Sequence, residues 1–286
     1  MAERVVGVIG GSGLYEIEGL EDVRAVRVDT PFGDPSGEYM TGRLGETRMV
    51  FLPRHGRGHT LLPSEVNYRA NVFGMKKLGV EWIISVSAVG SMKEEIKPGH
   101  IVVVDQFFDR TKGRESTFFG SGIVGHIEFA DPVCASLSDV LYGAAKEAGA
   151  SVKKGGTYVC IEGPQFSTRA ESMIYRSWGV DVIGMTNIPE AKLAREAEIC
   201  YATIALSTDY DCWHAEEESV TVEMILETLK KNVATAKEII RRAVSGIKHP
   251  RQCKCPGALK YAVITDSKAI PEGAKKDLSL LLGKYL

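Results

Sequence analysis

The sequence predicts an α/β protein built on one central sheet with helices on both faces. Short apolar runs alternate along the 286 residues with segments of helical periodicity, which is typical of such folds. The composition, 44% hydrophobic and 25% charged, belongs to a globular protein with a sizeable core. We find no internal repeat, low-complexity stretch or long linker. Residues 1–286 are therefore expected to form a single domain, with a helical C-terminal extension from about residue 247.

The apolar runs predict buried strands, and helix signals lie between them. In chain order the expected strands are Val5–Ile9, Met49–Leu52, Trp82–Val86, Ile101–Val104, Thr157–Ile161, Val180–Met185 and Tyr201–Leu206. The expected helices run from an N-cap at Ser64 to Leu78, from Asp131-Pro132 to Gly149, from a capping box at Thr168–Glu171, from Pro189, and from about Val222 to Ser245. Apolar spacing after Gly257 predicts one or two packing helices in the tail.

The charge balance argues against nucleic acid as a partner. The chain has 35 basic and 37 acidic residues and a net charge of -2, whereas proteins that bind nucleic-acid backbones usually carry a surplus of basic residues. An anionic ligand must then be held by a local site. We find no signal peptide and no 18-residue apolar run. The expectation is a cytoplasmic protein without membrane contact.

The six cysteines are too dispersed for a disulfide framework. Cys253-Lys254-Cys255 is the only close pair in the sequence. The interpretation we favour is a pair of solvent-side thiols, with a redox pair and a metal site as alternatives. A zinc site would need a second pair or a histidine couple, and His249 stands alone nearby, so no metal site is expected.

Glycine-rich and basic segments follow two of the expected strands. Gly10–Gly13 comes directly after the first strand, where backbone N–H groups can turn onto an anion, although a plain tight turn is the alternative. It matches neither a dinucleotide fingerprint, since Glu16 stands where glycine is needed, nor a P-loop. Arg54–His59 follows the second strand and could bind phosphate through Arg54 and His55, or form a solvated basic loop.

Hydroxyls, an aromatic ring and two acids follow later strands. The segments are Ser85–Ser91, Glu162–Ser167 with Phe166, Val182–Thr186, and Ser207–Trp213 with Asp209 and Asp211. The two acids could recognise a base, cap a turn or bind a metal. Ligands of α/β sheets bind outside the carboxyl ends of the strands, so these segments predict one shared site.

These motifs occur in the order found in methylthioadenosine phosphorylases, which the chain resembles from about Val5 to Arg241. The matching motifs are Gly-Gly-Ser-Gly, Arg-His-Gly-Arg-x-His-Thr, Pro-Ser-x-Val-Asn-Tyr, Glu-Gly-Pro-x-Phe-Ser-x-Arg-Ala-Glu-Ser, Met-Thr-x-x-Pro-Glu and Thr-Asp-Tyr-Asp-Cys-Trp. The resemblance implies a single α/β domain of the trimeric purine nucleoside phosphorylase type, with a distorted central mixed sheet flanked by helices. It also implies a homo-oligomer, either a trimer or a dimer of trimers.

The resemblance also assigns roles to residues. Its phosphate contacts fall on Ser12, Arg54, His55, Ser87, Ala88 and Thr186. Its nucleoside contacts fall on Phe166, Met185, Asp209 and Asp211, to which we add Ile183, and its specificity positions on Ser167 and Val222. His126 matches a residue that reaches the 5′ end of the nucleoside in the adjacent subunit. Gly184 replaces the asparagine of many members, and related enzymes of methylthioinosine share it.

The implied reaction is phosphorolysis of S-methyl-5′-thioadenosine to adenine and 5-methylthioribose 1-phosphate, with phosphate as a substrate and no cofactor. Asp209 is expected to supply a proton at purine N7 and Asp211 to orient the base. An apolar pocket with Val222 is expected at the 5′ end. The alternatives are a phosphorylase of methylthioinosine or 6-oxopurine nucleosides and a non-catalytic nucleoside- or phosphate-binding protein.

Overall fold

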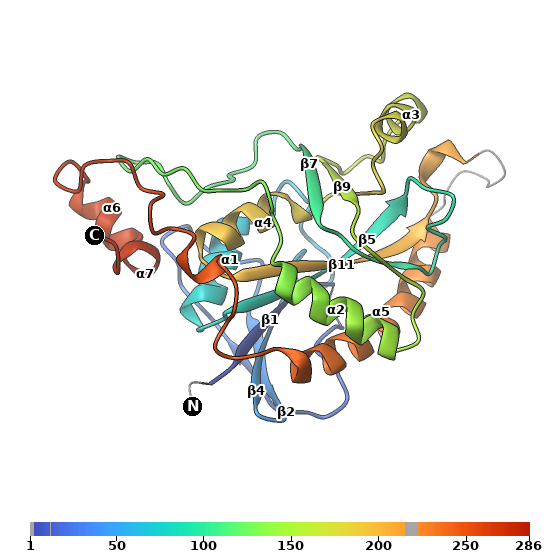
Figure 1. The fold of residues 1–286 in the computed structure, drawn as a ribbon, viewed down its shortest axis with the longest axis horizontal. Helices are drawn as coiled ribbons and strands as arrows, with labels where there is room; N and C mark the ends of the chain where they lie inside the picture. Colours follow the sequence, from blue (N-terminus) through green and yellow to red (C-terminus); the bar gives the residue numbers. More distant parts are fainter. Residues whose placement is uncertain (1–2, 12, 215–221) are drawn as a thin grey trace.

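The computed structural model describes residues 3–11, 13–214 and 222–286, without the side chains of 222–226. Its centre is an 11-stranded sheet of the described residues, in the order β2-β3-β4-β1-β5-β10-β9-β7, with β11 paired to β5 and β6, and β6 to β8 (Figure 1). The strands are β1 Val5–Gly10, β2 Leu20–Val26, β3 Tyr39–Leu44, β4 Thr47–Pro53, β5 Trp82–Ser91, β6 Ile101–Val103, β7 Gln106–Arg110, β8 Val152–Lys154, β9 Thr157–Ile161, β10 Val182–Gly184 and β11 Cys200–Asp209. Parallel and antiparallel pairs both occur, so the mixed sheet expected from the resemblance is present.

The long strand β5 changes its neighbour half-way, and this change distorts the sheet. Trp82–Ser85 pair in parallel with β1, whereas Gly90 and Ser91 pair antiparallel with β10. On its other side β5 stays paired with β11 along nearly its whole length. Residues 86–89 therefore have no strand pairing toward β1 or β10 within the described sheet. The sheet opens at this point, and the opening positions the site described below.

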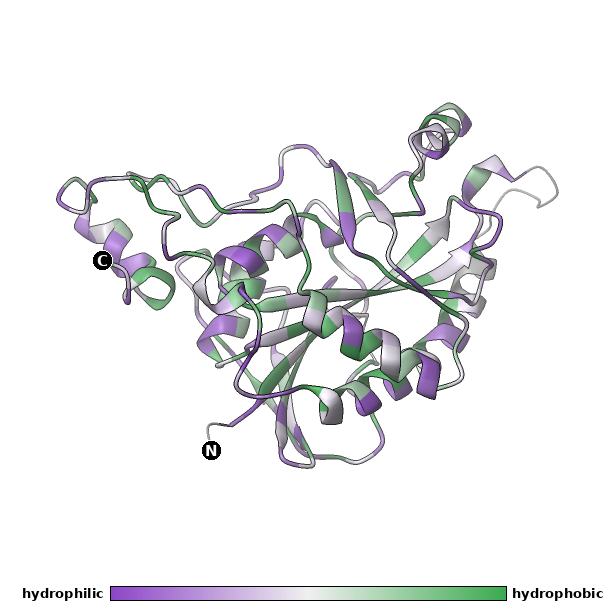
Figure 2. Cartoon of the chain, viewed as in Figure 1, coloured by the Kyte–Doolittle hydropathy of each residue, from purple (hydrophilic) through white to green (hydrophobic). Residues whose placement is uncertain are grey.

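Helices cover both faces of the sheet (Figure 1). They are α1 Tyr68–Lys77, α2 Ala135–Glu147, α3 Arg169–Ser177, α4 Asn187–Glu196, α5 Val222–Gly246, α6 Glu272–Asp277 and α7 Ser279–Leu282, with the short 3₁₀ helices η1 Asp211–Trp213 and η2 Cys255–Gly257. One large apolar core includes residues of α1, α4 and the C-terminal tail, and a second includes residues of α2 and α5. Figure 2 shows the hydrophobic residues on the strands and on the inner helix faces. None of the helices in the described part of the chain has both the length and the apolar character needed to cross a membrane.

Three helix starts differ from the sequence-based predictions. α4 begins at Asn187 rather than at Pro189, with a non-helical break at Ile188. Asn67, rather than Ser64, is the N-cap of α1, and its side chain accepts from the Ala70 N–H. Cys134, rather than Asp131-Pro132, is the N-cap of α2. The capping box of α3 at Thr168 and the extent of α5 are confirmed.

The sequence did not predict four of the strands, and two of these, β2 and β7, are largely exposed. β2 and β7 end the sheet and have exposed residues, so neither forms an apolar run. β3 and β8 were also missed, and β8 has only 3 residues. An edge strand pairs with another strand on one side only and is often exposed to solvent. Its sequence therefore need not be the apolar run that a buried strand shows.

Residues 118–130 and the tail 260–286 lie side by side and together form what we call the projecting arm (Figure 1). A bridge joins Gly125 to Val263, and the His126 N–H donates to the Ala262 carbonyl oxygen at 2.8 Å. The tail contains α6 and α7, so the one or two helices expected after Gly257 are present. Whether the tail is an extension of one domain stays a prediction.

Glu196, at the end of α4, is expected to make stability fall as pH rises. Its carboxyl accepts from the Thr117 hydroxyl and the Phe118 N–H, both at 2.7 Å. Burial raises the pKa of Glu196 to about 7 from an ordinary value of 4.5. Between these two values the folded state keeps a proton that the unfolded state has lost, so stability decreases across this window, by at most about 3 kcal/mol.

Glu196→Gln imitates the protonated carboxyl and should remove this dependence. Urea unfolding from pH 4.5 to 8 would measure it, as the difference between the wild-type and variant free energies of unfolding. Identical pH profiles for the two proteins would assign the proton to another group.

Candidate active site

A cavity of about 440 Å³ lies at the opening between β1, β5 and β10. Its walls come from the ends of β1, β4, β5, β9, β10 and β11, from the loops that follow β4 and β9, and from α5. The lining residues are Gly11, Leu14, Arg54, His55, His59, Pro63, Val86, Ser87, Ala88, Val89, Gly90, Ile161, Phe166, Ser167, Ile183, Gly184, Met185, Thr186, Leu206, Thr208, Asp209, Asp211, Leu229 and Val233. The strand ends that the sequence singled out therefore meet in one place.

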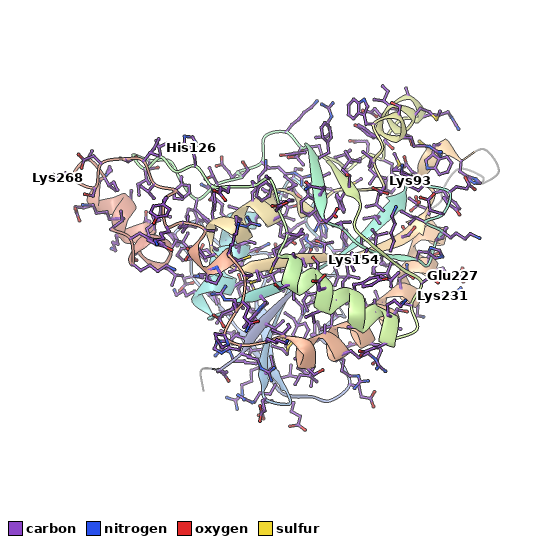
Figure 3. The ribbon with its side chains drawn as sticks, viewed as in Figure 1. Lys93, His126, Lys154, Glu227, Lys231 and Lys268 are labelled. Carbon is purple, nitrogen blue, oxygen red and sulfur yellow. The ribbon has the colours of Figure 1, made fainter. Side chains whose placement is uncertain are left out.

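Most of the residues expected at the site line this cavity. They are Arg54, His55, Ser87, Ala88, Phe166, Ser167, Ile183, Met185, Thr186, Asp209 and Asp211. Ser12 and the Val222 side chain lie outside the described residues. His126 does not line the cavity of its own chain, because it lies on the projecting arm (Figure 3).

Arg54 is buried in a close ion pair with Glu190 of α4. Its Nε donates to Glu190 Oε2 at 2.7 Å and its Nη2 to Glu190 Oε1 at 3.0 Å. The side chains are 3% and 1% exposed, so water screens the pair little. Burial by itself would lower the pKa of Arg54, but Glu190 raises it above its ordinary value, and the guanidinium stays charged. Sequence reasoning missed Glu190, although it stands in the matched Pro-Glu motif.

The other donors of Arg54 also have partners. Nη2 donates to the Ser85 hydroxyl and the Ile9 carbonyl, and Nη1 donates to the Val86 carbonyl at 3.0 Å. Nη1 has a second hydrogen, which leaves one donor of the guanidinium for a ligand among the described contacts. Arg54 is thus held rigidly. The paired Nε and Nη2 donors, which the sequence analysis assigned to phosphate, bind Glu190 instead.

Hydroxyl groups supply further anion donors. Ser87 Oγ lies 3.1 Å from Thr186 Oγ1 and 3.2 Å from the Tyr158 hydroxyl. Thr186 is also the N-cap of α4, and its side chain makes no capping hydrogen bond. The backbone is non-helical at Ile188 and Pro189 has no N–H, so the hydroxyls rather than the first turn of α4 are the donors for an anion here. The cluster can therefore bind phosphate through neutral donors.

His55 is neutral at physiological pH. Burial, followed by the charge of Arg54, lowers its pKa to about 4. Its Nδ1 lies 2.9 Å from the Leu61 carbonyl oxygen and must carry the ring proton to donate there. Nε2 is then an acceptor, which suits a hydroxyl of protonated phosphate rather than an unprotonated oxygen.

The acid segment after β11 is braced by hydrogen bonds. Asp209 Oδ1 accepts from the Asp211 N–H at 2.8 Å, so the turn-capping interpretation holds for this residue. Asp211 Oδ2 accepts from the hydroxyls of Ser167 at 2.8 Å and Ser172 at 2.5 Å. Ser167 lies just before the N-cap of α3 and Ser172 lies in its first turns, so the start of this helix fixes the carboxylate of Asp211.

Thr208 provides a place for a proton on Asp209. Its Oγ1 lies 2.7 Å from Asp209 Oδ2 and 3.2 Å from the Val89 carbonyl oxygen. A hydroxyl has one hydrogen, and when it donates to Val89 its lone pair can accept from a protonated Asp209. The same contacts therefore accommodate both protonation states of this acid. Sequence reasoning assigned no role to Thr208, although it adjoins Asp209.

Tyr158 explains why glycine stands at position 184. A Cβ on Gly184 would lie 2.0 Å from the Tyr158 hydroxyl oxygen, which no side chain allows. Tyr158 comes from β9 and is fully buried beside Ser87. Its ring fills the space that a side chain at position 184 would otherwise take.

Comparison with known proteins places this chain in a family. Residues 5–245 match the model of the phosphorylase superfamily. The S-methyl-5′-thioadenosine phosphorylase of Geobacter sulfurreducens is 67% identical, over 99% of this chain and 100% of that protein. This chain belongs to the S-methyl-5′-thioadenosine phosphorylase family. The resemblance inferred from the sequence motifs is thereby confirmed.

Solved structures of the family share the fold. A methylthioadenosine phosphorylase from an antarctic soil metagenomic library has a TM-score of 0.93 and 48% identity, covering 99% of this chain and 100% of its own. A mutant adenosine/methylthioadenosine phosphorylase from Schistosoma mansoni in complex with methylthioadenosine has a TM-score of 0.80 and 37% identity, with 98% of each chain covered. The predicted phosphorylase-like α/β fold is therefore confirmed as well.

Proposed function

We propose that this chain catalyses the phosphorolysis of S-methyl-5′-thioadenosine to adenine and 5-methylthioribose 1-phosphate. The observation that carries the proposal is that a single cavity is lined by both an anion-binding cluster and a pair of acids. The first suits the attacking phosphate and the second suits a purine. The relatives described above are named for this substrate and this reaction. Phosphate is a substrate here, and the proposed steps require no cofactor.

In this proposal the phosphate lies against Ser87, Thr186 and the remaining donor of Arg54, with Ser12 and Ala88 as further contacts. Neutral His55 accepts a hydrogen bond from a protonated phosphate oxygen. The bound anion attacks C1′ of the ribose, and its charge stabilises the cationic sugar that develops as the bond to the purine breaks. The rigid Arg54–Glu190 pair keeps this end of the site pre-organised.

The purine leaves more readily when N7 is protonated, because an anionic base is a poor leaving group. Asp209 supplies that proton and Thr208 accommodates the change of protonation state. Asp211, held by two serine hydroxyls, orients the base and its exocyclic amine. Phe166 flanks the ring, and Ile183 and Met185 contact the nucleoside. Leu229 and Val233 of α5 give the cavity an apolar wall suited to a methylthio group, with Ser167 and Val222 as specificity positions.

The direct test is incubation with S-methyl-5′-thioadenosine, with and without inorganic phosphate, followed by identification of the products. We expect adenine and 5-methylthioribose 1-phosphate, both only when phosphate is present. Free methylthioribose formed without phosphate would indicate a hydrolase, and binding without products would indicate a non-catalytic nucleoside-binding protein.

Methylthioinosine is the second candidate substrate, and Gly184 favours it, since related enzymes with that substrate share this residue. Asp209 and Asp211 favour adenine, because a site for a 6-oxopurine would more often present an amide. The ratio of kcat/KM for the two nucleosides decides between them.

We propose that the chain works as a homo-oligomer, a trimer or a dimer of trimers, in which His126 completes a neighbouring site. The side chain is exposed on the projecting arm, among the exposed apolar residues Val124, Tyr261 and Ile264. Such apolar groups on a projecting segment are typical of a surface that contacts another copy. His126 would then reach the 5′ end of a nucleoside bound in the adjacent subunit.

Mixed oligomers test this role of His126. His126→Ala and Asp209→Asn subunits, refolded together in equal amounts, should regenerate intact sites where an unchanged Asp209 meets an unchanged His126. Random mixing restores about a quarter of the sites. Activity should therefore exceed that of either parent. If His126 acts within its own subunit, the mixture will show only the mean activity of the two parents.

We also propose a cytoplasmic location. None of the six cysteines forms a disulfide, which suits a reducing compartment. Cell fractionation with antibody detection would test it.

A further inference from the structure

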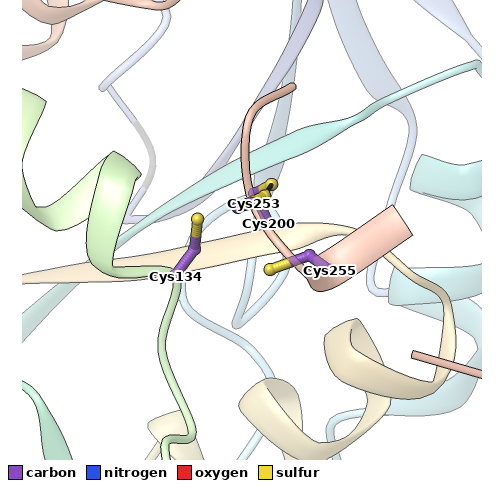
Figure 4. Close-up of side chains that lie close together, drawn as sticks. All are labelled: Cys134, Cys200, Cys253 and Cys255. Atoms are coloured by element: carbon purple, nitrogen blue, oxygen red, sulfur yellow. Dashed lines mark hydrogen bonds between the residues drawn. The ribbon is translucent and has the colours of Figure 1, made fainter. Parts of the chain in front are cut away.

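Four cysteine sulfurs converge at one point of the molecule, away from the cavity described above. The Sγ atoms of Cys134, Cys200, Cys253 and Cys255 all lie within 4.8 Å of one another (Figure 4). Cys134, Cys200 and Cys255 are buried, and Cys253 is partly exposed. The sequence-based interpretation of Cys253 and Cys255 as solvent-side thiols is therefore wrong. It failed because the second pair comes from residues far away in the chain.

Three separate segments hold the four thiols in place. Cys134 is the N-cap of α2, and its N–H donates to the carbonyl oxygen of Tyr201, which adjoins Cys200 at the start of β11. Cys253 and Cys255 lie just before and at the start of η2. The Arg251 side chain ties this segment to the turn before β11 through the Glu198 carbonyl oxygen at 2.7 Å. These hydrogen bonds bring the thiols together independently of any bond between them.

The number, type and spacing of these atoms fit a tetrahedral metal ion. Thiolate sulfurs about 2.3 Å from zinc stand about 3.8 Å from one another in a tetrahedron, and four cysteines form a closed structural zinc site. Cys200 and Cys253 Sγ lie 3.3 Å apart, and no two of the four sulfurs are more than 4.8 Å apart, so the tetrahedral value lies between these two distances. A disulfide needs about 2.05 Å and joins only two sulfurs. Two separate disulfides would not require all four sulfurs to lie at one point.

The surroundings suit the charge of such a complex. Four thiolates and one divalent ion carry a net charge of about -2. Cys134 caps the N-terminus of α2, whose first turn has no acidic residue, so the positive end of this helix faces the cluster. Arg251 and Lys254 flank Cys253 in the sequence. The acids near this segment are Glu81, paired with Arg251 and His249, and Glu198, paired with Lys284.

We propose that these four cysteines bind one Zn²⁺ ion in a structural site. Binding releases the four thiol protons to solvent and involves no oxidation. Cys200 and Asp209 are the first and last residues of β11, and at about 3.3 Å per residue they lie about 30 Å apart. The ion therefore takes no part in the reaction. It joins the segment before the C-terminal tail to the sheet, close to where Glu198 accepts from the Leu259 N–H and the Tyr285 hydroxyl.

The full-length protein, purified under reducing conditions and incubated with Zn²⁺, should retain about one zinc ion per chain after gel filtration, measured by mass spectrometry of the metals. The same protein with Co²⁺ should show the visible absorption of a tetrahedral cobalt thiolate. Cys253→Ser/Cys255→Ser should lower the bound zinc at least about tenfold and lower the melting temperature. The matched control is Cys160→Ala, because Cys160 is buried elsewhere in the core and should leave the zinc content unchanged.

Two results would overturn the proposal. One is a wild-type protein that keeps all four thiols free and retains neither Zn²⁺ nor Co²⁺ after incubation. The other is a metal-free protein, purified without reductant, whose intact mass is lower by two hydrogens per disulfide and whose peptides link any of these cysteines. Both readouts use the wild type, so they decide even if the double variant does not fold.

Discussion

Asp209→Asn is expected to lower kcat/KM for S-methyl-5′-thioadenosine by about 10²–10⁴. The amide cannot give up a proton to N7, although it keeps the size and most hydrogen bonds of the acid. Its oxygen can still accept from the Asp211 N–H, so the turn after β11 should persist. Steady-state kinetics at saturating phosphate would measure the loss. The amide N–H₂ should also shift the relative preference toward 6-oxopurine nucleosides, because it can donate to O6.

Asp105→Asn is a matched control for this experiment. Asp105 accepts from the Gly156 N–H at 2.9 Å and does not line the cavity, so its substitution should leave turnover unchanged. An Asp209→Asn protein with wild-type kcat/KM would show that this residue is not the purine acid.

Breaking the pair of Arg54 and Glu190 is expected to have the second large effect. Arg54→Met leaves a buried carboxylate without its cation and should cost about 3–5 kcal/mol of stability. It should also raise the KM for phosphate far more than the KM for nucleoside, because a charged donor is lost. Urea unfolding and phosphate-dependent kinetics would measure the two effects separately.

The double variant Arg54→Met/Glu190→Met separates structure from binding. Removing both charges relieves the unpaired carboxylate, so the double variant should be less destabilised than the sum of its parents, by about 3 kcal/mol. Its phosphate KM should nevertheless stay as high as that of Arg54→Met. A double variant that recovers wild-type phosphate KM would mean that Arg54 has only a structural role.

Local sequence signals determined the core strands and several helix boundaries. β1, β5, β9 and β11 were visible as apolar runs because a strand buried on both faces has little room for polar residues. The capping box of α3 was equally readable, since its hydrogen bonds join residues three positions apart. The motifs at the strand ends identified most of the cavity wall, because the carboxyl ends of parallel strands meet at one edge of a sheet.

The polar edges of the sheet could not be read in this way. β2 and β7 lack apolar runs because each has exposed residues, and only their pairing with β3 and β9 makes them strands. The start of α2 was misplaced for a related reason. An Asp-Pro pair is a local helix signal, whereas Cys134 became the N-cap because its N–H is bound to Tyr201 of β11.

Other features exist only through contacts between distant residues. Glu190 is 136 positions from Arg54, and nothing local shows that the two charges neutralise each other. Tyr158 occupies the space beside Gly184 only because β9 lies next to β10. The four thiols meet because Cys134, Cys200 and the Cys253-Lys254-Cys255 segment are brought together by the start of β11 and the returning tail. Local sequence thus determined the elements and the chemical groups they carry. The tertiary structure alone decided which groups meet, because burial, ion pairing and metal coordination depend on distances that the chain sets only after folding.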